Sequence, residues 1–250
     1  MLTATNITKN YPGAPGVLGG IDLTVPDGQF LAIMGPSGSG KSTLLHILSG
    51  MEPPTGGSVH LDGRELTQLA ERDLAALRLR HLGFVFQQPR MLQALSLRDN
   101  VALPGLLAGR VSRSRVAARA DELMSAMGVA RVASHLPSQV SGGQLQRASI
   151  CRALINGART LMGDEPTGAL NRASAEQVLD LLAGVHRQGH TLVVVTHDPQ
   201  VAARADRVLA LVDGAITTDL DLGTCPSPYS EEVRAERVGE VSALMTALGV

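Results

Sequence analysis

The sequence predicts an α/β fold: a mainly parallel β-sheet, preceded by an antiparallel β layer and interrupted by an inserted helical subdomain. Three observations predict it. Short continuous apolar runs that end in polar residues are typical of buried parallel strands. Alternating segments with turn residues near the start are typical of antiparallel hairpins. A long central stretch instead follows the 3.6-residue period of helices.

The antiparallel layer is expected at the start of the chain. The segments ATNITKNY and GGIDLTVPDG alternate between apolar and polar residues. SVHLDGREL, residues 58–66, also alternates and turns at Asp62-Gly63, a pair that favours a tight hairpin. These segments predict antiparallel strands before the parallel sheet.

Four later runs are typical of buried parallel strands: FLAIM (30–34), LGFVFQ (82–87), TLMGDE (160–165) and TLVVVTHD (191–198). Ligands in open parallel sheets collect at the carboxyl ends of the strands. We therefore expect the residues at the ends of these strands, Gly35, Gln87, Asp164 and His197, to converge on one edge of the sheet.

Helices are expected in the rest of the chain. An insertion of about residues 88–158 contains helices broken by Pro89, Pro104, Gly128 and Pro137, with an amphipathic piece over 113–127. Another amphipathic helix is expected over 173–188. Residues 1–223 are thus interpreted as one domain carrying the insertion. Residues 224–250 are interpreted as a linker and a C-terminal helix, 230–248, that packs on the same domain.

Composition narrows the class of protein. The 250 residues carry a net charge of −1 and only 2% aromatic residues, so nucleic acid is not an expected partner. The longest apolar runs are far shorter than the roughly 20 residues of a membrane-spanning helix. The N-terminus lacks the pattern of a signal peptide, so a cytoplasmic protein is expected. Cys151 and Cys225 lie far apart and are interpreted as ordinary thiols.

The stretch GPSGSGKST matches the pattern G-x-x-x-x-G-K-[ST] at Gly35, Gly40, Lys41 and Ser42. Glycines let backbone N–H groups turn inward to bind an anion at a helix N-terminus. Only Lys9 and Lys41 are lysines among the 22 Lys and Arg residues. A compact ammonium can reach the β- and γ-phosphates through the crowded loop, where a planar guanidinium fits poorly. With the Ser42 hydroxyl on Mg²⁺, the loop predicts a nucleoside triphosphate site.

Two adjacent carboxylates follow the strand predicted in TLMGDE. Asp164 is placed to hold the metal through water, and Glu165 to polarise the attacking water as a general base. Gln87 and His197 follow other predicted strands and are candidates for the same site.

A second motif, VSGGQLQRASICRALI, spans residues 140–155. Ser141, Gly142 and Gly143 stand just before a predicted helix, which gives a second helix start suited to an anion. The chain therefore has two phosphate-type sites but one lysine loop.

With these motifs in order, residues 2–215 strongly resemble the nucleotide-binding subunit of an ABC transporter. GPSGSGKS resembles the family's Walker A motif, VFQ its Q-loop, VSGGQ its signature, LMGDE its Walker B and THD its switch histidine. The resemblance implies a P-loop NTPase core of the ABC ATPase fold. It implies nucleotide binding by Tyr11, Gly35, Ser37, Gly38, Ser39, Gly40, Lys41, Ser42 and Thr43, with Tyr11 stacked on adenine. It further implies catalytic roles for Glu165, His197 and Gln87; a signature contact to the γ-phosphate of a partner by Ser141, Gly142, Gly143 and Gln144; and a Mg²⁺ site at Ser42, Gln87 and Asp164.

The same resemblance implies an assembly. ATP and Mg²⁺ would hold two copies head to tail, and hydrolysis would drive a separate transmembrane permease from the cytoplasmic face of the membrane. We expect the permease to dock near residues 89–97, where Met91, Leu92 and Leu95 are predicted to be exposed.

Within the family, GFVFQ, DNVALPGLLAG and EPTGAL most resemble the subgroup for macrolide export, lipoprotein release and antimicrobial-peptide resistance. The alternatives are an importer subunit and an ABC ATPase without a transport role, such as a cell-division-type or regulatory protein. Two positions depart from the family pattern. Val140 replaces leucine at the start of the signature, and Asn171 replaces the aspartate of the D-loop. Asn171 either alters communication between the two ATP sites or is a harmless variant.

Overall fold

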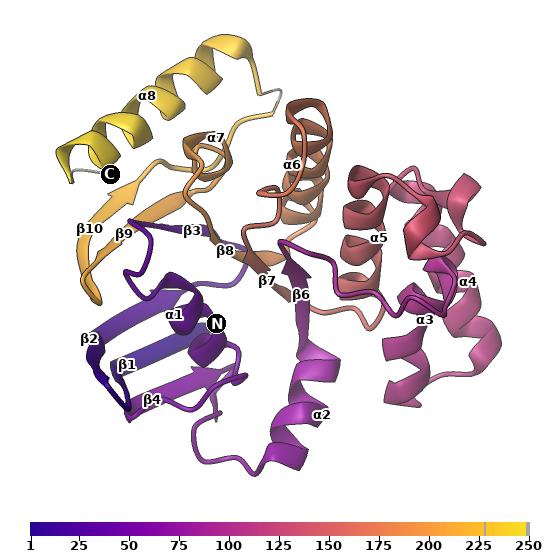
Figure 1. Ribbon diagram of the computed structural model, residues 1–250, viewed down its shortest axis with the longest axis horizontal. Helices are drawn as coiled ribbons and strands as arrows, with labels where there is room; N and C mark the ends of the chain where they lie inside the picture. The colour runs from indigo at the N-terminus through magenta and orange to yellow at the C-terminus, as the bar shows by residue number, and fades with distance from the viewer. Residues whose placement is uncertain (228, 249–250) are drawn as a thin grey trace. The chain divides into compact units, whose positions relative to one another are not determined.

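The computed structural model describes residues 1–227 and 229–248. The chain forms two compact units (Figure 1). The first combines residues 1–74 with the chain from residue 191 onward, and the second consists of residues 75–190. The domain boundaries expected from the sequence stay a prediction.

The first unit contains the antiparallel layer that the sequence predicts. Its four strands are β1 (Leu2–Tyr11), β2 (Ala14–Val25), β4 (Gly56–Leu61) and β5 (Arg64–Glu65), in the order β2-β1-β4-β5. Strands β4 and β5 are joined at Asp62-Gly63, both with positive φ, as the predicted hairpin requires. Leu2, Ala4 and Ile7 of β1 are buried, and they fix the face of the layer that packs inward.

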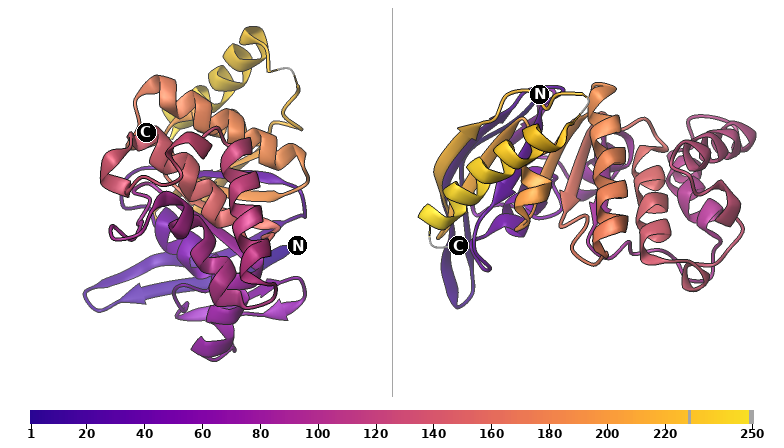
Figure 2. Two further views of the ribbon diagram at one scale, coloured as in Figure 1. Left: turned by 90° about the vertical axis from the view of Figure 1, so that its right-hand side faces the viewer. Right: turned by 90° about the horizontal axis from the view of Figure 1, so that it is seen from above.

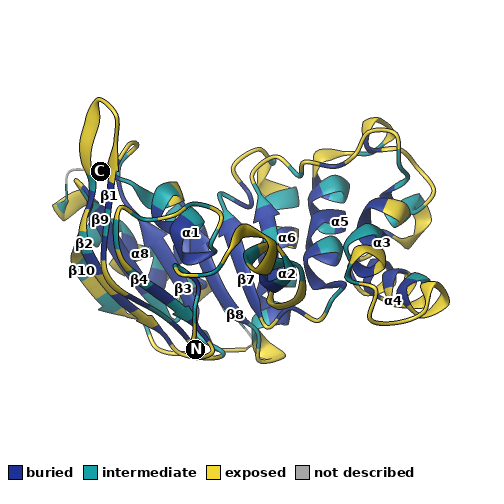
Figure 3. Ribbon diagram, turned by 90° about the horizontal axis from the view of Figure 1, so that it is seen from below, coloured by how far each residue is buried: buried dark blue, intermediate teal, exposed yellow. Residues whose placement is uncertain are grey.

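The same unit holds the strands that carry the glycine loop. The strand β3 (Phe30–Met34) pairs in parallel with β8 (Thr191–Val195) and β9 (Arg207–Val212), and β9 pairs antiparallel with β10 (Ala215–Asp221). Every residue of β3 and β8 is buried, as Figure 3 shows by colour. Because Ile33 lies opposite Val195, Gly35 and His197 follow neighbouring strands at the same edge.

Three helices complete the first unit: α1 (Lys41–Leu48), α7 (Pro199–Ala202) and α8 (Glu231–Ala247). Ser230 caps α8 by accepting a hydrogen bond from the Val233 N–H, so the predicted C-terminal helix begins where expected. It packs on α7, and its residues Arg237, Val241 and Met245 are buried. Figure 2 shows the helix in yellow beside strands of the same unit. The helix α8 thus packs within the first unit, and its expected place in the domain of residues 1–223 stays a prediction.

The second unit contains two parallel strands, β6 (Leu82–Phe86) and β7 (Thr160–Asp164). Its helices are α3 (Leu97–Ala108), α4 (Arg113–Ala126), α5 (Gly142–Leu154) and α6 (Arg172–Arg187), with short 3₁₀ turns at Ala130–Val132 and Pro137–Gln139. The helix α2 (Glu71–His81) spans the boundary in sequence between the two units. The helix α5 is central, since it packs against β6, α3, α4 and α6.

Two sequence-based expectations in this unit are wrong. Pro104 does not break a helix but lies inside α3, whose buried residues pack on α5 and whose start is capped by Ser96. Tertiary packing here outweighs the helix-breaking tendency of proline. Met91, expected at the surface, is buried, because Asn100 of α3 holds the segment that follows it. The Asn100 amide donates to the carbonyls of Leu92 and Leu95 and accepts from the Leu92 N–H.

Within the described residues, none of the helices has both the length and the apolar character needed to span a membrane.

Candidate nucleotide-binding and hydrolysis site

The glycine loop between β3 and α1 is shaped to receive an anion. Gly40 has φ +98° and serves as the N-cap of α1, where a Cβ would come within 2.8 Å of the Val17 carbonyl oxygen. Only glycine fits there without strain. In α1, all of whose residues are described, no side chain caps the first turn and no acidic residue lies in it. The start of α1 thus lacks a side-chain cap, and its helix dipole favours an anion such as a phosphate.

The lysine and serines of the loop fit the same ligand. The Lys41 Nζ donates to the carbonyl oxygens of Gly35 and Pro36, at 2.8 and 2.7 Å, so the ammonium lies against the loop. The Ser39 Oγ is buried and has no hydrogen-bond partner among the described residues. Ser37 and Ser42 are exposed. A buried hydroxyl that lacks a partner, in the same loop as the Lys41 ammonium, is a feature that a bound phosphate oxygen would satisfy.

Tyr11 lies at the end of β1, with its ring exposed. Its hydroxyl donates to a Glu52 carboxylate oxygen at 2.5 Å. This hydrogen bond to an anion is the main reason that the pKa of Tyr11 is raised, and the Thr43 side chain, in the first turn of α1, acts in the opposite direction. The residue expected to stack on a base is therefore adjacent to the first turn of α1.

His197 is exposed and lies two residues beyond the end of β8. The next residue, Asp198, caps α7 by accepting a hydrogen bond from the Gln200 N–H at 2.8 Å. A buried strand on one side and a capped helix on the other thus hold His197 in place.

In the second unit, Asp164 ends β7 and lies opposite Phe86 of β6, so Gln87 and the two carboxylates follow neighbouring strands. Glu165 has φ +48°, a left-handed conformation that is uncommon for residues other than glycine, asparagine and aspartate. Such backbone strain concentrates at functional sites. Gln87 is exposed and lies against Gly168, where a Cβ would be 2.8 Å from its Nε2.

The signature motif starts α5 and is held by its own side chains. The Ser141 Oγ accepts from the Gln144 N–H at 3.3 Å, and the Gln144 Oε1 accepts from the Ser141 N–H at 3.0 Å. This capping box orients the helix start. Gly142 is exposed, whereas Gly143 is buried against Ser174, with only 2.8 Å between its ideal Cβ and the Ser174 Oγ.

Sequence reasoning missed Gln146. This buried residue of α5 donates from Nε2 to the carbonyl of Phe86, at 3.0 Å, and to that of Pro166, at 2.6 Å. It thereby fixes the backbone just before Gln87 and just after Glu165. A polar residue on the apolar stripe of a predicted helix was the available signal.

The expected residues are divided between the two units. The glycine loop, Tyr11 and His197 belong to the first unit. Gln87, Asp164, Glu165 and the signature belong to the second. The convergence of Gly35, Gln87, Asp164 and His197 on one edge, and the contact of the signature with a partner's γ-phosphate, stay predictions.

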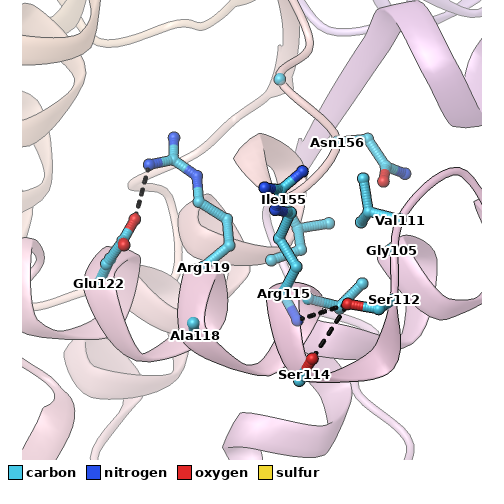
Figure 4. Close-up of a pocket in the computed structure, with 12 residues that line it drawn as sticks. Gly105, Val111, Ser112, Ser114, Arg115, Ala118, Arg119, Glu122, Ile155 and Asn156 are labelled. Carbon is cyan, nitrogen blue, oxygen red and sulfur yellow. Dashed lines mark hydrogen bonds and ion pairs between the residues drawn. The ribbon is translucent and has the colours of Figure 1, made fainter.

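A hollow of about 790 Å³ in the second unit contains none of these residues (Figure 4). It lies between α3, α4 and the turn after α5. Two pairs of its polar groups are already matched: Arg119 with Glu122, and Ser112 with Ser114 (Figure 4). We assign it no part in nucleotide binding.

A glycine loop of this kind between a buried strand and an uncapped helix defines a P-loop NTPase of the α/β class. Comparison with known proteins identifies the family. The ABC transporter family matches residues 18–168, more than half of the chain, and the chain belongs to that family. The resemblance predicted from the motifs is confirmed.

Curated relatives place the chain near one subgroup. It is 50% identical over 224 residues to the macrolide export ATP-binding/permease protein MacB 1 of Aeromonas hydrophila, a match that covers 89% of this chain and 34% of the relative. The corresponding MacB protein of Rhodopseudomonas palustris (strain HaA2) is 49% identical over 199 residues, covering 80% of this chain and 30% of the relative. The chain thus spans about a third of the length of these relatives.

Solved structures support the same assignment. The chain is similar to the ATP-binding cassette MJ0796, described as a dimer in a post-hydrolysis state bound to ADP and Pi, with a TM-score of 0.82 and 37% identity. The match covers 89% of this chain and 99% of the other. A second dimeric structure of MJ0796 gives a TM-score of 0.83 at 38% identity. The expected ABC ATPase fold is confirmed.

Proposed function

We propose that the chain binds and hydrolyses ATP as a head-to-tail homodimer and drives a transmembrane permease in export or extracytoplasmic mechanical work. The observation that carries the proposal is that one chain has two helix starts of phosphate-binding type. One is the lysine-bearing start of α1, which has no side-chain cap, and the other is the Ser141-Gly142-Gly143 start of α5. One chain offers each half of a composite site once, so two chains would complete two sites.

The residues divide the chemistry between them. The glycine loop and Lys41 hold the β- and γ-phosphates, and the Tyr11 ring stacks on the adenine. Glu165 accepts the proton of the attacking water, and His197 and Gln87 orient the γ-phosphate and the water. Ser141, Gly142, Gly143 and Gln144 of the second copy contact the γ-phosphate from the other side.

Mg²⁺ fits the donors that these residues supply. The Ser42 hydroxyl, the Gln87 amide oxygen and the Asp164 carboxylate are the oxygen ligands that Mg²⁺ prefers. The described residues contain no group of three or more His, Cys, Asp or Glu side chains able to hold a metal. We propose that the phosphate oxygens of ATP complete this coordination.

The MacB relatives are ATP-binding/permease proteins by name. We propose that this chain works with such a permease at the cytoplasmic face of the membrane. Leu92, 51% exposed on a segment held by Asn100, is the apolar contact we expect for it. Leu92→Asp should reduce permease binding, whereas Leu107→Asp, equally apolar and 68% exposed, serves as the matched control.

The decisive experiment replaces the general base. Glu165→Gln should lower kcat by about 10²–10⁴-fold. It should also trap an ATP-bound dimer visible by size-exclusion chromatography. The wild-type rate should rise faster than linearly with protein concentration. Glu122→Gln, the same change at an exposed position of α4, is the control. An active Glu165→Gln variant would overturn the assignment of the base.

A further inference from the structure

Lys9, the other of the two lysines in the sequence, has only 8% of its surface exposed. Its Nζ lies 2.8 Å from a Glu52 carboxylate oxygen and donates to the Pro53 carbonyl at 2.7 Å. Lysine is almost never this deeply buried unless it is paired. The pairing satisfies the charge, but the position of the ammonium suggests a further role.

The Lys9 ammonium lies over the ring of Tyr11, 4.8 Å from its centroid. Both residues lie on β1, two positions apart. The cation lies on one face of the ring, while 36% of Tyr11 is exposed. The exposed part of Tyr11 is therefore accessible to a base.

Glu52 connects this ring to the phosphate-binding helix. It accepts hydrogen bonds from Tyr11 and Lys9 together. The N–H groups of Met51 and Glu52 both donate to the carbonyl of His46, in the last turn of α1, at 2.8 and 3.2 Å. The backbone that carries this carboxylate is thus hydrogen-bonded to the same helix whose first residue is Lys41.

We propose that Lys9 and Glu52 are positioning residues that hold the Tyr11 ring at a fixed distance from the glycine loop and tune it for a purine base. The inference rests on the proposed stacking role of Tyr11.

Two physical effects support this role. An ammonium over one face of an aromatic ring draws electron density toward itself, which favours stacking of an electron-rich purine on the opposite face. The bonds to Glu52 immobilise the ring before the nucleotide arrives, so less conformational entropy is lost on binding. Neither Lys9 nor Glu52 needs to touch the nucleotide.

The test measures binding of the adenine base separately from binding of the phosphates. Binding of ATP and of inorganic tripolyphosphate to the full chain is measured by calorimetry without Mg²⁺, for wild type, Lys9→Met, Lys9→Arg, Tyr11→Leu and the double variant Lys9→Met/Tyr11→Leu. Arg207→Met is the matched control, because it removes another ion pair of the same unit, the one between Arg207 and Asp219 at 2.6 Å.

We expect Lys9→Met to weaken ATP binding by about two- to fivefold and to leave tripolyphosphate binding unchanged. Lys9→Arg should retain most of the ATP affinity that Lys9→Met loses. Arg207→Met should leave the affinities for ATP and for tripolyphosphate unchanged. The double variant should bind ATP no more weakly than Tyr11→Leu alone, because Lys9 acts through the ring.

Equal weakening of ATP and tripolyphosphate by Lys9→Met would overturn the inference, since it would indicate general damage to the loop. The inference would also be overturned if the double variant lost as much ATP-binding free energy as Lys9→Met and Tyr11→Leu together. If Tyr11→Leu left ATP binding unchanged, the stacking role and this inference would both fail. Failure of the wild type to bind either ligand would instead overturn the proposed nucleotide site itself.

Discussion

At the scale of single residues, Asn171, which replaces the aspartate of the family's D-loop, has a structural role as a helix cap. Its side-chain oxygen accepts a hydrogen bond from the Ser174 N–H at 2.9 Å and so caps α6. Asparagine and aspartate are about equally good in this position. The capping role alone therefore gives no reason to prefer aspartate.

This role makes the two interpretations of Asn171 testable. Asn171→Asp should leave the free energy of unfolding and the ATPase rate unchanged, whereas Asn171→Ala should cost about 1 kcal/mol of stability through the lost cap. Urea unfolding measures the free energy of unfolding, and steady-state hydrolysis measures the ATPase rate. A faster or slower Asn171→Asp enzyme of unchanged stability would favour altered communication between sites.

The two signature glycines should differ in their tolerance of a methyl group. Gly143→Ala should destabilise the protein by about 1–3 kcal/mol, because its Cβ would lie 2.8 Å from the Ser174 Oγ and 2.9 Å from the Ser174 Cβ. Gly142→Ala, with its nearest neighbour, Leu170, at 3.5 Å, should be close to neutral. Urea unfolding of the two variants compares them directly, and equal stabilities would contradict the packing argument.

The two cysteines should react differently. Burial raises the pKa of the Cys151 thiol to about 12, so almost no thiolate forms there at pH 8, while Cys225 is partly exposed. A thiol-reactive dye should therefore label Cys225 alone in the native protein and both cysteines in guanidinium chloride. Cys225→Ser is the control, and its rapid labelling under native conditions would contradict the burial of Cys151.

At the scale of elements, the C-terminal helix α8 depends on a buried guanidinium. Arg237 donates to the carbonyls of Ala203 and Ala205, just beyond α7, and to those of Leu222 and Gly223. Arg237→Met should cost roughly 2–4 kcal/mol, because several buried carbonyls lose their partner.

Urea unfolding measures this cost. Arg237→Lys should not restore the lost stability, since an ammonium cannot reproduce the forked geometry of the guanidinium. Glu236→Gln, an exposed neighbour on the same helix, is the control. Unchanged stability of Arg237→Met would show that α8 is held by its apolar residues alone.

Elements differ in how far the sequence predicts them. The strands β3, β6, β7 and β8 were predictable, because a continuous apolar run between turn residues is a local signal. Pro104 inside α3 was not, since the packing of α3 on α5 is a tertiary property. The roles of Gln146 and Arg237 were not predictable either. The partners of Gln146 lie 20 or more residues away in sequence, and those of Arg237 lie 14 or more residues away.

The candidate site shows the same division. The glycine loop and the signature were predictable because backbone conformation and helix capping depend on neighbouring residues. The contact of Lys9 with Glu52 joins β1 to the segment after α1, and no short pattern predicts it. Local chemistry was therefore visible in the sequence, and the residues that position it were not.

At the scale of the whole molecule, the proposed head-to-tail dimer predicts complementation between two inactive variants. Lys41→Ala removes the cation of the glycine loop, and Gly142→Glu places a carboxylate at the signature, where it would repel a γ-phosphate. Gly142 is exposed with only an ordinary contact to Leu170, so the larger residue should not prevent folding. Each homodimer would carry a defect in both of its sites.

A mixed dimer would instead combine the intact glycine loop of one variant with the intact signature of the other. Equal mixing should therefore recover up to about a quarter of the wild-type number of complete sites. ATP hydrolysis is measured for each variant alone and for the mixture at the same total concentration, and a mixture of Lys41→Ala with itself is the control. If each chain formed its site alone, the mixture would stay as inactive as its components, because no exchange of partners could bring an intact loop and an intact signature together.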